Sequence, residues 1–413
     1  MEKQLKPVIR FRGFTDPWEQ RKVGEVSKRV IVGLATSVTP YYREEGIPIL
    51  RNLNIKENYL DDTDILFLER SYAESQVSKQ IHAGDVLTVH TGYIGTSCVV
   101  PEKYDNCLTF TTLITTTDGS ILNGEFLAQY LNSEIGMSAV QAVTTQGGRQ
   151  NLNTNDFVKV EIRYPSLAEQ NGICNILRNI DNLITLHQRK YDKLQVIKKA
   201  MLEKMFPQNG SNIPEIRFRG FTDPWEQRKL GDFTGKVTEK NTGMSVTETF
   251  TNSAEFGVIS QLDFFDHAVS KDESISGYTI VCPEDFVYNP RISVTAPVGP
   301  INRNRLNRAG VMSPLYTVFR TDGSIDRVYL EHFFKTSGWH SYMQLNGNSG
   351  ARSDRFSIGD DTFFAMPIPA PSLEEQRQLA GFLESLDNLI TLHQRELEKL
   401  QKIKKAMLEK MFV

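Results

Sequence analysis

The chain has 413 residues, of which 39% are hydrophobic and 23% charged, and its formal net charge is -3. The length predicts two or more folded domains, and the composition excludes a wholly disordered chain. The near-neutral charge excludes a histone-like polycation, so any nucleic-acid binding must come from local patches. Because the sequence has no apolar stretch near the roughly 18 residues that span a bilayer, and its start lacks the apolar core of a signal peptide, we expect a soluble cytoplasmic protein.

The sequence is an internal tandem repeat of two similar halves. IRFRGFTDPWEQRK runs from Ile9 to Lys22 and returns unchanged from Ile216 to Lys229. A second pair, residues 177–206 and 383–412, matches at 23 of 30 positions with an offset of 206. Between these matched frames the two copies share little identity. The repeat therefore predicts one architecture that carries two different surfaces.

The first insert, residues 24–163, predicts a mixed α+β domain. Its β-branched and aromatic runs DVLTVH (85–90), SCVV (97–100) and LTFTTLITTT (108–117) are typical of strands. GEFLAQYLNSEIGMSAV (124–140) predicts one helix.

A long helix is expected to follow this insert. PSLAEQ places Ser166 as an N-cap and Glu169 three residues later, which is the capping-box spacing. Apolar residues then recur at three- and four-residue steps, which predicts an amphipathic helix of roughly 38 residues and about 57 Å. A lone helix would expose this stripe, so the two copies are expected to pack on each other, antiparallel if a pseudo-twofold axis relates the halves. The predicted helix seam or partner-docking residues are Leu183, Leu186, Leu194, Ile197, Met201, Leu386, Ile390, Leu397, Leu400, Ile403 and Met407.

The second copy repeats this order. After a linker at 207–213, GYTIVC, DFVYN and LYTVFRT are typical of strands, VYLEHFFKTSGWHSYM (328–343) predicts one helix, and PSLEEQ begins the second long helix. We therefore predict two globular α/β-mixed domains of the α+β class, at 1–165 and 214–371. They are separated by a pair of long antiparallel coiled-coil helices at 166–206 and 372–413.

Motifs for catalysis or metal binding are missing or incomplete. DPW, at 16–18 and 223–225, is reminiscent of the DPPW or DPPY loop of amino-methyltransferases, but it has one Pro and no FxGxG loop accompanies it. The segment at 231–236 is one residue short of a P-loop, and the histidines show no HExxH spacing. The four cysteines are too scattered for a disulfide scaffold or a metal cluster. His187 and His393 recur at equivalent helix positions, which favours a polar place in the seam over a metal ligand.

Basic groups give the clearest functional signal. Residues 286–321 contain no Asp or Glu and carry several Arg and Asn side chains, which can pair with phosphate, guanine or adenine. A second acid-free stretch, 135–155, holds a Gly-rich turn with Arg149, Gln150 and Asn151, and GNSGARSDR occupies the corresponding place in the second copy. The candidate DNA contacts are Tyr93, Arg149, Gln150, Asn151, Asn289, Arg291, Arg303, Arg305, Arg308, Arg352 and Arg355.

Several motifs together make the chain resemble the specificity subunit of type I restriction-modification systems. YPSLAEQ precedes IDNLITLHQRK in the first copy, PAPSLEEQ precedes LDNLITLHQRE in the second, and GDVLTVHTGYIG (84–95) and EDFVYNP (284–290) are further typical pieces. The resemblance covers essentially the whole chain. It implies that each insert is a target recognition domain that reads one half of a split, asymmetric DNA sequence.

The resemblance also implies the partners. The paired helices hold the recognition domains apart and dock two modification subunits, which methylate adenine, and a motor and nuclease subunit completes the restriction complex. S-adenosylmethionine, ATP and Mg are then expected in the partner subunits, and no cofactor and no catalytic residue in this chain. Three alternatives stay open from the residues: an independent methyltransferase, a coiled-coil adaptor without DNA contact, and a specificity protein of a related restriction system.

Overall fold

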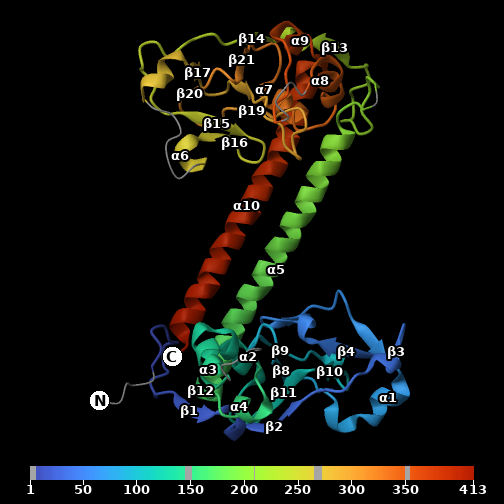
Figure 1. The fold of residues 1–413 in the computed structure, drawn as a ribbon, viewed down its shortest axis with the longest axis vertical. Coiled ribbons are helices and arrows are strands. Elements are labelled where there is room, and N and C mark those ends of the chain that lie inside the picture. The colour runs from blue at the N-terminus through green and yellow to red at the C-terminus, as the bar shows by residue number, and fades with distance from the viewer. Residues whose placement is uncertain (1–5, 145–150, 209, 265–271, 349–353) are drawn as a thin grey trace. The chain divides into compact units, whose positions relative to one another are not determined.

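The computed structural model describes residues 6–144, 151–208, 210–264, 272–348 and 354–413. It divides into two compact units: the first unit comprises Met1–Gln188 and Arg395–Val413, and the second unit comprises Arg189–Gln394. Each unit joins a globular part to segments of the two long helices, α5 (Leu167–Lys204) and α10 (Leu373–Met411) (Figure 1). None of the helices in the described residues is both long and apolar enough to cross a membrane. The division cuts through both helices, so the domain boundaries expected from the sequence stay a prediction.

The first unit is built on two four-stranded sheets. One is antiparallel with the strand order β2-β11-β8-β9, and the other has the order β10-β4-β7-β3, in which β10 and β4 run parallel. The pairs β1-β12 and β5-β6 form two-stranded ribbons. The strands are β1 (Glu19–Lys22), β2 (Ser27–Val32), β3 (Tyr42–Arg43), β4 (Ile47–Arg51), β5 (Ile55–Lys56), β6 (Tyr59–Leu60), β7 (Leu66–Leu68), β8 (Val86–Val89), β9 (Ser97–Val99), β10 (Leu108–Phe110), β11 (Thr112–Thr117) and β12 (Glu161–Tyr164). The shorter helices are α1 (Arg70–Ser75), α2 (Gly124–Asn132), α3 (Glu134–Val143) and α4 (Thr154–Phe157).

The second unit contains an antiparallel sheet of the same plan. Its order is β14-β21-β18-β19, and the pairs β13-β22, β15-β16 and β17-β20 form two-stranded ribbons. The strands are β13 (Glu226–Lys229), β14 (Thr234–Lys236), β15 (Phe250–Ser253), β16 (Gly257–Ser260), β17 (Thr279–Val281), β18 (Phe286–Tyr288), β19 (Ile301–Arg303), β20 (Gly310–Met312), β21 (Thr317–Thr321) and β22 (Pro367–Ala370). The shorter helices are α6 (Gln261–Phe264), α7 (Arg327–Phe333), α8 (His340–Asn346) and α9 (Asp360–Phe364). The two inserts thus share the strand order of this antiparallel sheet, although their sequences and their remaining strands differ.

The single helix predicted in each insert is wrong, because each is two helices. In the first unit Ser133 takes an extended conformation between α2 and α3, and its hydroxyl accepts a hydrogen bond from the amide of Gly136. In the second unit α7 ends at Phe333 and α8 begins at His340, and the indole of Trp339 donates to the carbonyl of Phe334 in the connection. The spacing of apolar residues continues across the breaks between α2 and α3 and between α7 and α8, so the sequence pattern did not reveal where each helix ends.

The identical sequence frames tie each long helix to its globular part. Glu375 is buried and accepts two hydrogen bonds from Arg217, at 2.6 and 2.8 Å, and Glu169 accepts two from Arg10 at 2.7 and 2.8 Å. Ser372 caps α10 by accepting from the amide of Glu375. The predicted N-cap is therefore confirmed for Ser372, whereas the Glu375 carboxylate forms a buried ion pair with Arg217 in place of the reciprocal bond of a capping box. Each pair links the first turn of a long helix to the repeated N-terminal frame of the same unit.

The neighbouring glutamine of each frame forms a second tie. The side-chain oxygen of Gln170 accepts from the amide of Asn123, the N-cap of α2, and that of Gln376 accepts from the amide of Asp326, the N-cap of α7. The same residue type thereby holds α5 to α2 in the first unit and α10 to α7 in the second.

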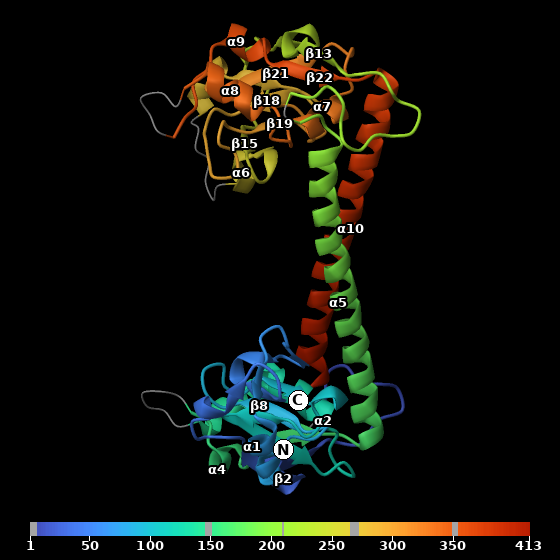
Figure 2. The ribbon, with the colours of Figure 1, turned by 90° about the vertical axis from the view of Figure 1, so that its right-hand side faces the viewer.

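Each globular core is completed by the end of a long helix from the other sequence copy. Phe412, which follows α10, packs in the first unit against Trp18, Phe126 and Tyr130. Figure 2 shows the C-terminus at the globular part of this unit. Phe206, which follows α5, packs in the second unit against Trp225, Tyr329 and Phe333. Neither globular core is therefore formed by its own repeat alone.

Candidate nucleic-acid interface

The β8-β9 hairpin of the first unit presents an aromatic residue to solvent. Val89 and Thr96 close the hairpin by a backbone hydrogen bond of 2.9 Å, and Tyr93 in the loop between them is 89% exposed. Gly92 and Gly95 have positive φ angles of 85° and 92°, a conformation that glycine adopts without strain. A Cβ on Gly95 would lie 3.0 Å from the sulfur of Met137, so the base of the loop packs closely on α3.

Residues 151 and 152, which are distant in sequence, form hydrogen bonds with this hairpin. The amide of Leu152 donates to the carbonyl of His90 at 2.9 Å, Asn151 forms an isolated β-bridge with Thr91, and the Oδ1 atom of Asn151 lies 2.9 Å from Nδ1 of His90. The structure thus brings two predicted DNA contacts, Tyr93 and Asn151, to one place. Arg149 and Gln150 lie outside the described residues.

The β18-β19 hairpin holds the equivalent position in the second unit. Its loop carries Val294 fully exposed, and the amide of Phe356 donates to the carbonyl of Pro290 at 2.8 Å. Arg291 forms an isolated bridge with Arg355, so two predicted contacts from separate segments meet here as well. The guanidinium of Arg291 stays largely exposed, 3.8 Å from the carboxylate of Asp354. Arg352 lies outside the described residues.

Asn289 shapes this loop from within. Its side-chain amide donates to the carbonyl of Asn252 at 2.8 Å, and its oxygen accepts from the amide of Arg291 at 3.0 Å. Both ends of the side chain are engaged by the protein, so the geometry favours a positioning role over the base contact expected from the sequence.

The acid-free stretch 286–321 is not a free basic surface. Arg308 forms a bidentate pair with Glu248 at 2.6 and 2.8 Å, and Arg320 pairs with Asp285 at 2.6 Å. Arg305 lies 2.8 Å from Glu331. All three partners lie outside the stretch, Asp285 directly before it, Glu331 after it and Glu248 further upstream, so the acid-free stretch itself did not reveal these pairs. Arg305 and Arg308 keep partly exposed guanidinium groups, and their DNA contacts stay a prediction.

Arg303 departs most clearly from the DNA contact expected of it. It is 7% exposed and pairs with Glu284 and Glu331, the latter at 2.7 Å. Burial opposes ionisation of Glu331, but Arg305 and Arg303 outweigh it and hold the pKa of this carboxyl below its ordinary value. The guanidinium is thus engaged by the protein's own carboxylates, which argues against the expected DNA contact.

A buried histidine lies beside this ion-pair cluster. His332 on α7 is buried, and within the described part of the chain neither ring nitrogen has a hydrogen-bond partner. Burial lowers the pKa of His332 to about 4. The ring is therefore neutral at neutral pH, which is the state that a buried, unpartnered imidazole tolerates.

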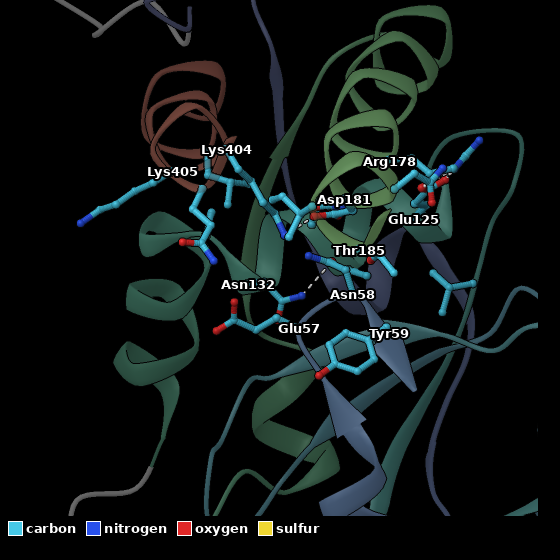
Figure 3. A pocket seen from close by; sticks show the side chains of 18 of the residues that line it. Glu57, Asn58, Tyr59, Glu125, Asn132, Arg178, Asp181, Thr185, Lys404 and Lys405 are labelled. Atoms are coloured by element: carbon cyan, nitrogen blue, oxygen red, sulfur yellow. Dashed lines mark hydrogen bonds and ion pairs between the residues drawn. The ribbon is translucent and has the colours of Figure 1, made fainter. Parts of the chain in front are cut away.

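One cavity of the first unit lies where the globular part meets α5 and α10. It has a volume of about 820 Å³, and part of its charged lining is paired: Arg178 with Glu125, and Lys404 with Asp181 at 2.7 Å (Figure 3). The side-chain amide of Asn132 donates to Asn58 at 2.8 Å across the same lining. These contacts join the globular part to α5, and α5 to α10, within the first unit.

No metal or thiol chemistry is evident in the described residues. No group of three or more His, Cys, Asp and Glu side chains there is placed to hold a metal ion. Burial raises the pKa of Cys107 to about 11 and that of Cys174 to about 12, and it raises the pKa of Cys98 further. These thiols stay protonated near neutral pH and are poor nucleophiles.

The comparison with protein families decides the identity. The model of the type I restriction modification DNA specificity domain matches residues 15–196 and again 222–402. The chain belongs to this family. Its two copies of the domain coincide with the two sequence repeats.

Similar proteins carry the same description. This specificity protein is 22% identical over 417 residues to a Methanocaldococcus jannaschii protein assigned as the MjaX type I restriction enzyme specificity subunit, covering 95% of this chain and 92% of that one. It is 24% identical over 290 residues to the MjaVIII specificity subunit of the same organism, covering 66% of this chain and 65% of that one. The crystal structure of the type I restriction-modification system S subunit from M. genitalium has the same fold, with a TM-score of 0.61 and 11% identity over 99% of both chains.

The long helices of this specificity protein expose part of the predicted seam. Leu386 and Leu397 are buried, whereas Leu183, Leu186 and Ile403 are exposed, and Leu194, Ile197, Met201, Ile390, Leu400 and Met407 are half-buried. Ile184 and His187 take the inward positions that the prediction gave to Leu183 and Leu186. His393 is half-buried too, as expected for a polar seam position.

Proposed function

We propose that this chain is the DNA sequence-recognition subunit of a type I restriction-modification complex. Each globular part reads one half of an asymmetric, bipartite DNA target, and the chain performs no catalytic step itself. One observation carries the proposal: the family domain occurs twice, with the same sheet order and different exposed loops. Two loops of different composition on one scaffold read two different sequences.

The proposed DNA contacts follow the β8-β9 and β18-β19 hairpins. In the first unit they are Tyr93 and Asn151, together with Arg149 and Gln150 of the adjoining segment. In the second unit they are Arg291 and Arg355, together with Arg352. Phosphate pairing by the arginines gives salt-dependent affinity, and side chains that reach base edges give the sequence preference.

The helices serve as the spacer, an antiparallel coiled-coil pair with pseudo-twofold symmetry. Two ion pairs support this proposal: Asp181 with Lys404 in the first unit, and Asp387 with Lys198 in the second. Asp387 lies 206 residues after Asp181, and Lys404 lies 206 residues after Lys198, so the second pair repeats the first with the two helices exchanged. Charged pairs inside a helix seam specify one register.

Two modification subunits would dock on this spacer, one for each repeat. Leu183 and Leu186 of the first repeat are exposed, and so are Leu389 and Leu392, which lie 206 residues later. Exposed leucines at matched positions are suited to two identical partners. Restriction subunits complete the assembly, and S-adenosylmethionine, ATP and Mg belong to these partner subunits.

A footprint tests the proposal directly. The chain is assembled with its modification subunits and bound to a DNA library that carries its target, and protection from cleavage is mapped on both strands. We expect two protected segments with base-specific contacts, separated by base pairs whose identity does not matter. A complex lacking this chain should protect nothing specifically. Protection of a single continuous word, or no protection by the complete complex, would contradict the function.

A further inference from the structure

The two hairpin loops, residues 90–95 between β8 and β9 and residues 290–299 between β18 and β19, have the same construction. Each connects equivalent strands of the four-stranded antiparallel sheet. Each is held to a distant segment by backbone hydrogen bonds: Leu152 donates to His90 in the first loop, and in the second loop Phe356 donates to Pro290 and Ile292 donates to Asp354. Each turns through a glycine with positive φ, Gly95 at 92° and Gly299 at 84°.

Each loop exposes an apolar side chain to solvent. Tyr93 is exposed in the first loop, and Val294 is exposed in the second. Neither loop contains an acidic residue. Single exposed apolar residues are ordinary on a protein surface, but the same placement on two divergent inserts is not expected from chance exposure.

The surroundings of the two tips offer an apolar and a basic group, each beside an acidic residue, Glu57 in the first unit and Asp354 in the second. Next to Tyr93 lies a cavity of about 600 Å³, which Leu53, Tyr59 and Thr91 help to line. The hydroxyl of Thr91 accepts from Asn52 at 2.9 Å, so the wall of this cavity is fixed. Near Val294 the basic side chain is Arg291, which suits a phosphate backbone.

We infer that Tyr93 and Val294 are specificity-determining residues that make apolar contacts with bases, each in its own half of the target. The inference rests on the proposed function and deepens it. Apolar side chains contact bases through the thymine methyl group or by wedging against a base step, and neither contact neutralises a phosphate. The different tips, an aromatic ring and a small branched chain, account for two halves that differ in sequence.

The test compares single variants in the assembled complex with modification subunits and DNA. We expect Tyr93→Ala to weaken binding about tenfold, which corresponds to about 1.4 kcal/mol, and to relax base preference in one half-site only. We expect Tyr93→Phe to stay within about twofold of the parent because it keeps the ring. Val294→Ala should act on the other half-site only. The slope of binding against salt should not change for either variant, since no ionic contact is lost.

Matched controls separate these tips from apolar exposure in general. Val77 and Leu315 are 67% and 53% exposed in the first and second units and do not belong to the two loops. Val77→Ala and Leu315→Ala should bind and mark DNA as the parent does. The inference is overturned if Tyr93→Ala and Val294→Ala keep the parent's affinity and marked sites, or if either variant affects both halves equally. A parent complex that recognises no split target would instead contradict the proposed function.

Discussion

Removing the ring of Phe412 should destabilise the first unit and leave the second unchanged. The side chain is 2% exposed, and its ring centroid lies 6.2, 5.5 and 5.8 Å from those of Trp18, Phe126 and Tyr130. Truncation of a buried phenylalanine costs about 3 to 5 kcal/mol, and the aromatic pairs place Phe412→Ala in this range. A chain end can undock locally, so the measured loss is limited by the free energy that holds the end in the core.

Hydrogen exchange followed by mass spectrometry locates the effect. A loss of about 3 kcal/mol corresponds to roughly a hundredfold faster exchange in α2, which carries Phe126 and Tyr130, provided that these amides exchange through opening of the unit. Phe206→Ala should produce the mirror result in α7 of the second unit. Ile403→Ala, at an exposed position of α10, should cost less than about 1 kcal/mol. Unchanged exchange in α2 for Phe412→Ala would refute the reasoning that a helix end from one repeat completes the core of the other.

Three further predictions test individual interactions. Glu375→Gln removes the charge from the buried pair with Arg217 and should lower the free energy of unfolding of the second unit by about 3 to 5 kcal/mol, measured by urea denaturation; a loss below about 1 kcal/mol would mean that the pair is not buried in solution. The pKa of His332 is lowered from 6.5 to about 4, so below pH 6.5 the unfolded chain binds a proton that the folded chain does not, and the free energy of unfolding falls by up to about 3 kcal/mol as the pH drops to 4. His332→Gln, chosen because Gln129 stands at the equivalent position of α2, should reduce this pH dependence, measured by denaturation at pH 7.5 and 5. The same loss of stability in the variant and the parent would exclude the histidine as its source. Arg291→Ala should weaken DNA binding at all sequences and reduce the salt slope by about 1; a preserved slope would show that this guanidinium does not meet a phosphate.

The sequence was most informative where structure depends on neighbouring residues. The starts of α5 and α10 follow the Ser-x-x-Glu signal, and the strands β8, β18 and β21 lie within runs of β-branched and aromatic residues. The sequence repeat also predicted that the two inserts share an order of strands and helices. These features arise from local patterning and from comparison of one half of the chain with the other.

Features set by tertiary contacts were beyond the sequence. The partners of Arg308 and Arg320 lie 60 and 35 residues away, so an acid-free stretch looked like a basic surface that the folded chain largely neutralises. The roles of Phe206 and Phe412 were hidden for the same reason, because each completes a core built from the other repeat. The two hairpin tips were only half foreseen: Tyr93 stood in a typical motif, whereas Val294 carries no sequence signal apart from its acid-free surroundings.

The most direct test of the account is a map of methylated adenines in DNA from cells that contain this chain and its modification subunits. Two unlike recognition domains on one spacer predict a split target, with two different half-sites at a fixed separation and one methylated adenine in each. Exchanging residues 214–371 for the corresponding domain of another specificity protein should change one half-site and keep the other. Methylation within one uninterrupted sequence, or a domain exchange that changes both halves, would contradict the account.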